Sequence, residues 1–158
     1  MRPAAQAAQR RQPYVVSAEA PAITWSDYAR IAPGEYLAYC RAARVYRDPG
    51  FRRWVCLLRW EVLDGSSHKV IARLPMWFAL GKDAEPHAGR RSLYWREWVR
   101  AAGASPTRAD RLAPTVFRRR MARVSVRNTA GDAPYSVVAE ILHYETGAHG
   151  ESSVQPVT

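Results

Sequence analysis

The chain of 158 residues has few lysines, few cysteines and no long apolar run. Cys40 and Cys56 are the only cysteines, and the absence of a Cys-x-x-Cys pair with nearby histidines excludes a zinc ribbon and a disulfide scaffold. No stretch approaches the roughly 20 consecutive apolar residues of a membrane-spanning helix, which excludes that class of protein. The first 22 residues carry three arginines but no apolar core, so we expect no secretory signal and a cytoplasmic, reducing location.

Motifs of catalysis are lacking as well. The chain contains no Gly-x-x-x-x-Gly-Lys phosphate loop, no His-Glu-x-x-His zinc helix and no Gly-x-Ser-x-Gly nucleophile turn. A metal-dependent nuclease needs clustered carboxylates, whereas the acidic residues outside the termini are scattered, as at Asp64, Asp83, Glu85, Asp110 and Glu140. The four histidines have no ligand spacing. We therefore expect a protein that is not an enzyme and holds no metal or cofactor.

Positive charge is what the sequence has in excess. Lysine and arginine number 24 against 14 acidic residues, which gives a net charge of +10 and a pI near 10.3. All but two of these basic residues are arginines, whose planar guanidinium group can form two hydrogen bonds to one phosphate and can stack on bases. A basic domain of this size is typical of a nucleic-acid partner. A charge that serves solubility alone is the alternative.

The length fits one domain with a sizeable core. Residues 1–22 are rich in Ala, Gln, Arg and Pro, which predicts a flexible basic arm, and residues 147–158 predict a disordered polar tail. The folded unit is expected at 23–146. Within it, the patterns predict three strands, one helix and two more strands, at 35–46, 52–63, 68–78, 93–102, 115–128 and 135–144.

The second of these strands has the clearest pattern. Its even positions from 54 to 62 are all apolar, which predicts that Trp54, Cys56, Leu58, Trp60 and Val62 face the core. The helix is predicted to begin after Ser92 as its N-cap and to end at Gly103.

Three strands in a meander, a helix and a closing hairpin follow the plan of the five-stranded oligonucleotide-binding (OB) barrel. Features that carry a closer resemblance are Gly34-Glu35-Tyr36, the long strand at 51–63, the helix at 92–103, and Val116-Phe117 before the basic segment 118–127. In these the chain resembles the single-stranded-DNA-binding proteins of phage and mobile-element replication modules. The resemblance implies a mainly β, OB-like antiparallel barrel that binds single strands during DNA replication or recombination. The acidic C-terminal tail by which many such proteins recruit partners is absent, since Glu151 is the last acidic residue.

Two groups of residues are candidates for nucleic-acid contacts. On the predicted fourth strand, Arg119, Arg123 and Arg127 share one face at a spacing of roughly 13 Å, with Arg118 and Arg120 at its start, and Ala122, Val124 and Val126 suit the core. An ordinary solvated sheet face is the alternative. Around the first turn, the candidates are Arg44, Tyr46, Arg47, Phe51 and Arg53, together with Arg59 on the second strand. Tyr46 and Phe51 are the candidates for base stacking.

Other clusters have a simpler interpretation. The run 75–78 is expected in the core or at a helix-packing site, with a binding surface as the alternative, and the helix aromatics Tyr94, Trp95 and Trp98 are expected in the core. Arg90 and Arg91 precede the helix, whose first N–H groups favour phosphate, and are further candidates.

The leading hypothesis is a non-catalytic single-stranded nucleic-acid-binding protein, with DNA as the expected strand. The alternative is a protein-interaction module, an inhibitor or adaptor, whose basic face docks an acidic partner. Homo-oligomerisation through edge strands stays open.

Overall fold

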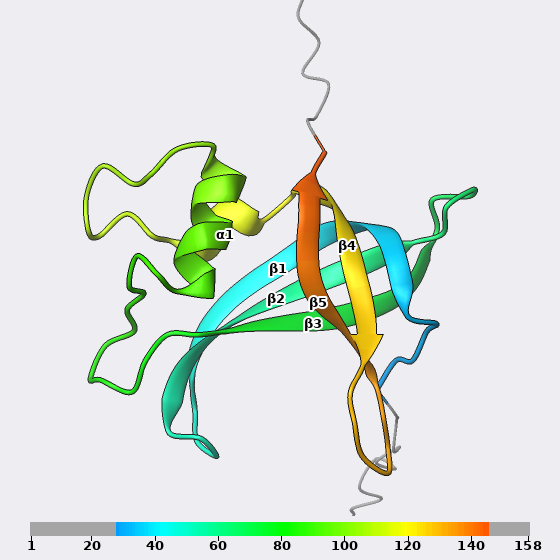
Figure 1. Cartoon of the computed structure of the whole chain (residues 1–158), viewed down its shortest axis with the longest axis horizontal. Helices are drawn as coiled ribbons and strands as arrows, with labels where there is room; N and C mark the ends of the chain where they lie inside the picture. The colour runs from blue at the N-terminus through cyan, green and yellow to red at the C-terminus, as the bar shows by residue number, and fades with distance from the viewer. Residues whose placement is uncertain (1–27, 146–158) are drawn as a thin grey trace, which may run out of the picture.

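The computed structural model describes residues 28–145 and contains one sheet, one α-helix and one 3-10 helix (Figure 1). The elements are β1 (Gly34–Asp48), β2 (Arg53–Leu63), β3 (Val70–Ala79), α1 (Leu93–Ala102), η1 (Pro114–Phe117), β4 (Met121–Asn128) and β5 (Ser136–Tyr144). The predicted arm at 1–22 and tail at 147–158 lie outside the described residues. The predicted order of three strands, a helix and two strands is confirmed.

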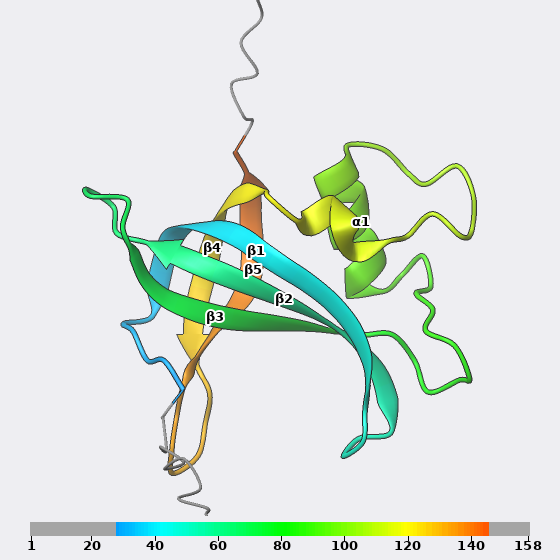
Figure 2. The ribbon, with the colours of Figure 1, turned by 180° about the vertical axis from the view of Figure 1, so that it is seen from behind.

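All neighbouring strands run antiparallel, in the spatial order β3-β2-β1-β4-β5. The long strand β1 joins the two halves, because it pairs with β2 along most of its length and with β4 through its first part. The pairing with β2 shifts between Cys40 and Ala42, so that Arg41 is an extra residue of the kind that bends a strand. The sheet curves until β4 and β5 cross over β1, β2 and β3 (Figures 1 and 2).

The two edge strands, β3 and β5, approach each other closely. Within residues 28–145 no ladder of hydrogen bonds joins them, so the sheet is open. A mainly β fold with five antiparallel strands and one helix is thus confirmed, whereas closure into a barrel stays a prediction.

The inner face of the curved sheet forms the core. Cys56, Leu58, Trp60 and Val62 of β2 are fully buried, as the alternation predicts, and Trp54 at the end of the series is half-buried. From β4, Ala122, Val124 and Val126 face the same core, which confirms their predicted parity. Helices α1 and η1 cover its open side, where the rings of Phe78, Tyr94 and Phe117 pack with centroids 5.6–5.9 Å apart.

Helix α1 is bounded as the sequence predicts. The Ser92 hydroxyl accepts a hydrogen bond from the Trp95 N–H at 3.2 Å, and Gly103 ends the helix at a φ of 79°. Tyr94 is buried, while Trp95 and Trp98 are half-buried. No helix of the described chain is long and apolar enough to cross a membrane.

The fourth strand begins later than predicted, at Met121 instead of residue 115. Pro114 opens a 3-10 turn, a position that suits its restricted φ, and this turn places Phe117 in the core. Arg119 then has a φ of 62°, outside the extended region. The segment 115–120 therefore does not continue the strand.

Candidate nucleic-acid interface

The outer face of β1, β2 and β3, which is turned away from the core, carries a row of three cross-strand neighbours. Arg44 lies opposite Leu57, and Leu57 lies opposite Trp77. Directly paired residues project from the same face of a sheet, so these side chains lie side by side. Trp77 is 43% exposed and Arg44 is exposed, while Leu57 between them is buried. The row therefore presents an aromatic side chain and a guanidinium to solvent.

Two flanking rows extend this surface. Arg59 lies in one of them, between Ala42 and Pro75, and Tyr46 lies in the other, opposite Val55. Successive rows are about 7 Å apart. The Arg44 guanidinium lies 5.5 Å from the centre of the Tyr46 ring, which is a cation–π contact. We call the surface formed by Arg44, Tyr46, Arg59 and Trp77 the sheet face (Figure 2 shows its three strands in front of β4 and β5).

The turn between β1 and β2 adds a second exposed aromatic at one end of the sheet face. Phe51 is 67% exposed, and the guanidinium of Arg53 lies 4.9 Å from its ring centre. The Asp48 carboxylate accepts hydrogen bonds from the backbone N–H groups of Gly50 and Phe51, at 2.8 and 3.3 Å. These hydrogen bonds stabilise the turn that presents Phe51.

The other carboxylate near the sheet face is also engaged. Glu61 lies one row beyond Arg59 on β2, opposite Arg73 of β3, and their side chains form an ion pair at 3.3 Å. The guanidinium groups of Arg44 and Arg59 form no ion pair with any residue of the described part. Their charge is therefore available to an anionic ligand.

Trp77 was missed in the sequence, where the run 75–78 was expected in the core or at a helix-packing site. Met76 and Phe78 are buried as expected, but Trp77 points the other way, so that part of the prediction is wrong. The signal was the parity of β3: Arg73 shares its face with Trp77, and an arginine in mid-strand marks the solvent side.

The five arginines predicted along the start and one face of the fourth strand do not form a single row on a strand. Arg119 precedes β4, and its backbone N–H donates to the Cys40 carbonyl at 2.9 Å. Arg118 follows η1, and the side chain of Arg120 donates to the Val116 carbonyl at 3.2 Å. Only two of the five arginines lie on β4: Arg123 is half-buried and Arg127 is exposed. The regular spacing expected for Arg119, Arg123 and Arg127 is therefore wrong, because the chain is not extended before Met121.

The remaining candidates lie away from the sheet face. Arg47 pairs with Trp54 on the core-side parity of β1, with its guanidinium 6.0 Å from the indole and 3.4 Å from the Asp83 carbonyl. The Arg47 side chain thereby holds the loop that follows β3 close to β1. Arg90 and Arg91 lie before α1, on the other side of the sheet.

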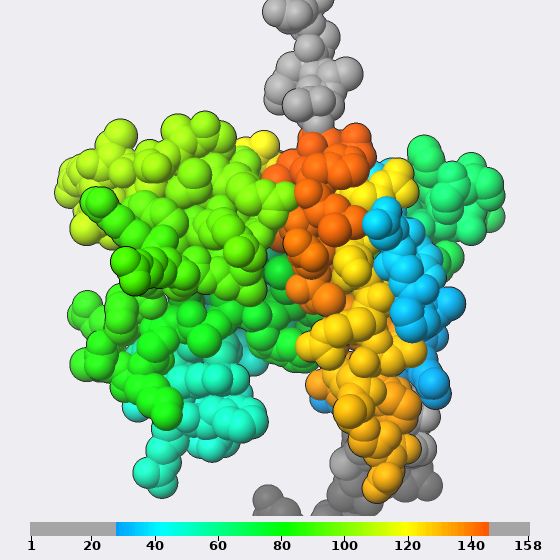
Figure 3. Space-filling model, viewed as in Figure 1, coloured from blue at the N-terminus to red at the C-terminus, as the bar shows by residue number. Residues whose placement is uncertain are grey.

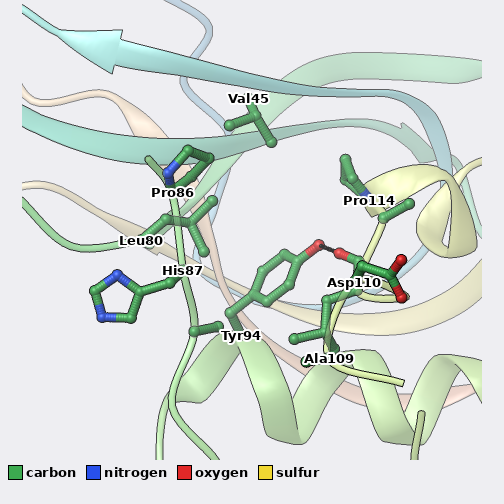
Figure 4. Close-up of a pocket in the computed structure, with 11 residues that line it drawn as sticks. Val45, Leu80, Pro86, His87, Tyr94, Ala109, Asp110 and Pro114 are labelled. Carbon is green, nitrogen blue, oxygen red and sulfur yellow. Dashed lines mark hydrogen bonds between the residues drawn. The ribbon is translucent and has the colours of Figure 1, made fainter. Parts of the chain in front are cut away.

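A concave region beside α1 has a different character. A cavity of about 520 Å³ lies between Val45, Leu80, Tyr94 and Pro114, and the Tyr94 hydroxyl donates to the Leu112 carbonyl at 2.6 Å on its wall (Figure 4). Its lining is mainly aliphatic, and its rim includes the carboxylate of Asp110. A mainly apolar lining does not favour a polyanion.

The two cysteines are buried free thiols. Burial raises the pKa of Cys40 and of Cys56 to about 12, which keeps both in the neutral form at physiological pH. No group of three or more metal-ligating side chains occurs among residues 28–145.

Comparison with known proteins does not assign this surface to a family. No protein-family model matches the chain, and no curated protein matches it. Function has to be inferred from the residues of the sheet face and the architecture that carries them.

Proposed function

We propose that this protein binds single-stranded nucleic acid, with DNA as the expected strand, across the sheet face and the β1–β2 turn of an OB-like, partly open barrel. The architecture supports the proposal in two ways. The neighbours β4-β1-β2-β3 have the Greek-key order, and the OB fold is a partly open five-stranded barrel of that kind. In OB folds the face of the second and third strands and the loop between the first two strands bind oligonucleotides. The sheet face and Phe51 occupy these positions.

The observation that carries the proposal is the exposure of Trp77 beside unpaired arginines. A large aromatic side chain on a strand is usually buried, and exposed aromatics with basic neighbours are typical of single-strand binding grooves. One base can stack on the indole of Trp77, while Arg44 and Arg59 contact the phosphates on either side. Tyr46 and Phe51 offer further stacking surfaces toward the turn.

This arrangement favours single strands over duplexes and is tolerant of sequence. Bases in a duplex are already stacked on each other, so their faces are not accessible to Trp77. Stacking and phosphate contacts read no base edge, so affinity is expected to vary little with sequence. A role in replication or recombination of a phage or mobile element rests on the sequence resemblance alone.

The proposal is tested by tryptophan fluorescence with an oligonucleotide of about eight thymidines. The wild-type protein is expected to bind with quenching. Trp77→Ala is expected to lose most of the quenching and to bind about 5-fold to 150-fold more weakly, which corresponds to about 1–3 kcal/mol for one stacked base. Trp98→Phe is the control, because it also removes one indole but lies on α1, away from the sheet face, where its N–H donates to the Ala113 carbonyl.

The control variant should retain wild-type affinity. If Trp77→Ala is folded and binds as tightly as the wild type, the sheet face is not the binding surface. If the wild type binds no single strand even at low salt, the proposal is wrong and the docking of an acidic protein partner becomes the better explanation of the basic surface.

A further inference from the structure

A second basic surface lies on α1, on the opposite side of the sheet from Trp77. A groove of about 490 Å³ runs along the helix and is lined by four arginines, at positions 90, 91, 96 and 100, with Trp95 and Val99 between them. Figure 3 shows α1 and the loop after it standing beside β5 on this side of the molecule. We call this concavity the α1 groove.

Its positive charge is largely uncompensated. The nearest carboxylate, Glu97, is 1% exposed, and Arg100 donates to both of its oxygens at 2.9 Å. Arg96 approaches the same carboxylate only at 3.6 Å and is exposed. Arg90 and Arg91 are exposed and form no ion pair within the described chain. Three guanidinium groups therefore face solvent with no partner carboxylate exposed beside them.

The groove is held rigidly in place. Arg100 donates to the carbonyls of Ile141 and Leu142 at 2.8 and 2.7 Å, which ties the helix to β5. The Arg90 guanidinium lies 5.7 Å from the centre of the Trp95 ring, a contact that orients this side chain over the groove. Guanidinium groups held in place, as those of Arg90 and Arg100 are, lose less entropy on meeting an anion.

The path between the two basic surfaces is short in the chain. β3 ends at Ala79, two residues after Trp77, and the loop 80–92 leads from there to the start of α1. The chain therefore passes from the strand that carries Trp77 to the helix that carries the α1 groove. The first N–H groups of α1, near Arg90 and Arg91, add to the attraction for phosphate there.

We propose that the α1 groove binds the phosphate backbone of the same single strand beyond the segment held on the sheet face. This inference rests on the proposed function, and it extends it to the length of strand bound. The sheet face supplies base stacking and holds a short segment, while the α1 groove supplies phosphate contacts that only a longer strand can reach. A short and a long oligonucleotide should therefore differ in which arginines they need.

The test compares Arg90→Ala/Arg91→Ala with the wild type on thymidine strands of about 8 and about 30 nucleotides. The strand is kept in excess, so that each one holds at most one protein. Arg108→Ala/Arg111→Ala is the control, because it removes the same charge from the loop that follows α1, where both arginines lie beside Asp110. Arg100 is left intact because it anchors the helix.

The double variant is expected to bind the short strand as the wild type does and the long strand about tenfold more weakly. Its salt slope on the long strand should be smaller by about 1.4, which is two phosphate contacts at about 0.7 each. Equal losses on both strands, or no loss on the long strand, overturn the inference while leaving the proposed function standing. A wild-type chain that binds neither strand overturns both.

Discussion

The ion pair of Glu97 and Arg100 within α1, whose arginine also bonds to β5, allows a quantitative prediction about stability. Arg100 donates to both carboxylate oxygens of Glu97 and to the carbonyls of Ile141 and Leu142. Arg100→Leu removes all four hydrogen bonds and leaves the buried Glu97 carboxylate with only Arg96, 3.6 Å away, as a charged neighbour. Breaking a fully buried pair in this way costs about 3–5 kcal/mol. Because the Arg100 side chain is 35% exposed, water can reach the site, and we expect a loss of about 2–3 kcal/mol.

Two further variants separate the ion pair from the packing of the helix. Glu97→Leu should cost less than Arg100→Leu, because Arg100 keeps its bonds to the two carbonyls and remains partly hydrated. The double variant Glu97→Leu/Arg100→Leu should be more stable than Arg100→Leu alone by about 1 kcal/mol or more, because no buried charge is left unpaired.

The assay is urea unfolding followed by tryptophan fluorescence, with the free energy of unfolding extrapolated to water. A loss of about 2–3 kcal/mol should also lower Tm by roughly 10 °C for a domain of this size. The reasoning is refuted if Arg100→Leu costs less than about 0.5 kcal/mol, or if the two single losses simply add in the double variant.

The two thiols and the β2–β3 turn give further predictions. Iodoacetamide at pH 8 should label neither Cys40 nor Cys56 in the native protein, because both thiols are buried and burial raises the pKa of each to about 12. In denaturant it should label both. Mass spectrometry measures the labelling, and stoichiometric labelling of the native protein would contradict this prediction. Hydrogen bonds from the backbone N–H groups and hydroxyls of Ser66 and Ser67 hold the pKa of the exposed Asp64 carboxyl well below its usual range. A depressed pKa stabilises the fold above about pH 4 and progressively less as the pH falls. The Tm difference between wild type and Asp64→Ala should therefore shrink from about pH 4 to pH 2, and a constant difference would show that the carboxylate contributes nothing through its charge.

The parts of the fold that the sequence predicts correctly are those with one strong local pattern. Alternation along β2 identifies Leu58, Trp60 and Val62 as core residues because one face of that strand packs on the interior. The bounds of α1 follow from Ser92 and Gly103, whose capping roles depend on the nearest turn alone.

The sequence predictions are wrong where contacts between residues far apart in the sequence determine the local structure. Trp77 lies in an apolar run that outweighs the one local signal, its shared parity with Arg73, and its pairing with Leu57 of β2 places it on the outer face. Arg119 belongs to a basic run that looks continuous, yet its backbone bonds to Cys40 and its φ is positive. Of the residues predicted for the site, Arg44, Tyr46 and Arg59 lie together on the sheet face, whereas Arg47 points to the other face.

The open edge of the sheet bears on how copies of this chain can associate. A free edge strand is a template for pairing with another chain, and proteins protect such edges against aggregation. On β5 the Arg100 guanidinium donates to the carbonyls of Ile141 and Leu142, so these acceptors already have a partner. On β3, Pro75 has no N–H to donate. The two edge strands of the open sheet therefore each carry, near the middle of the edge, a feature that disfavours pairing with the edge strand of another molecule.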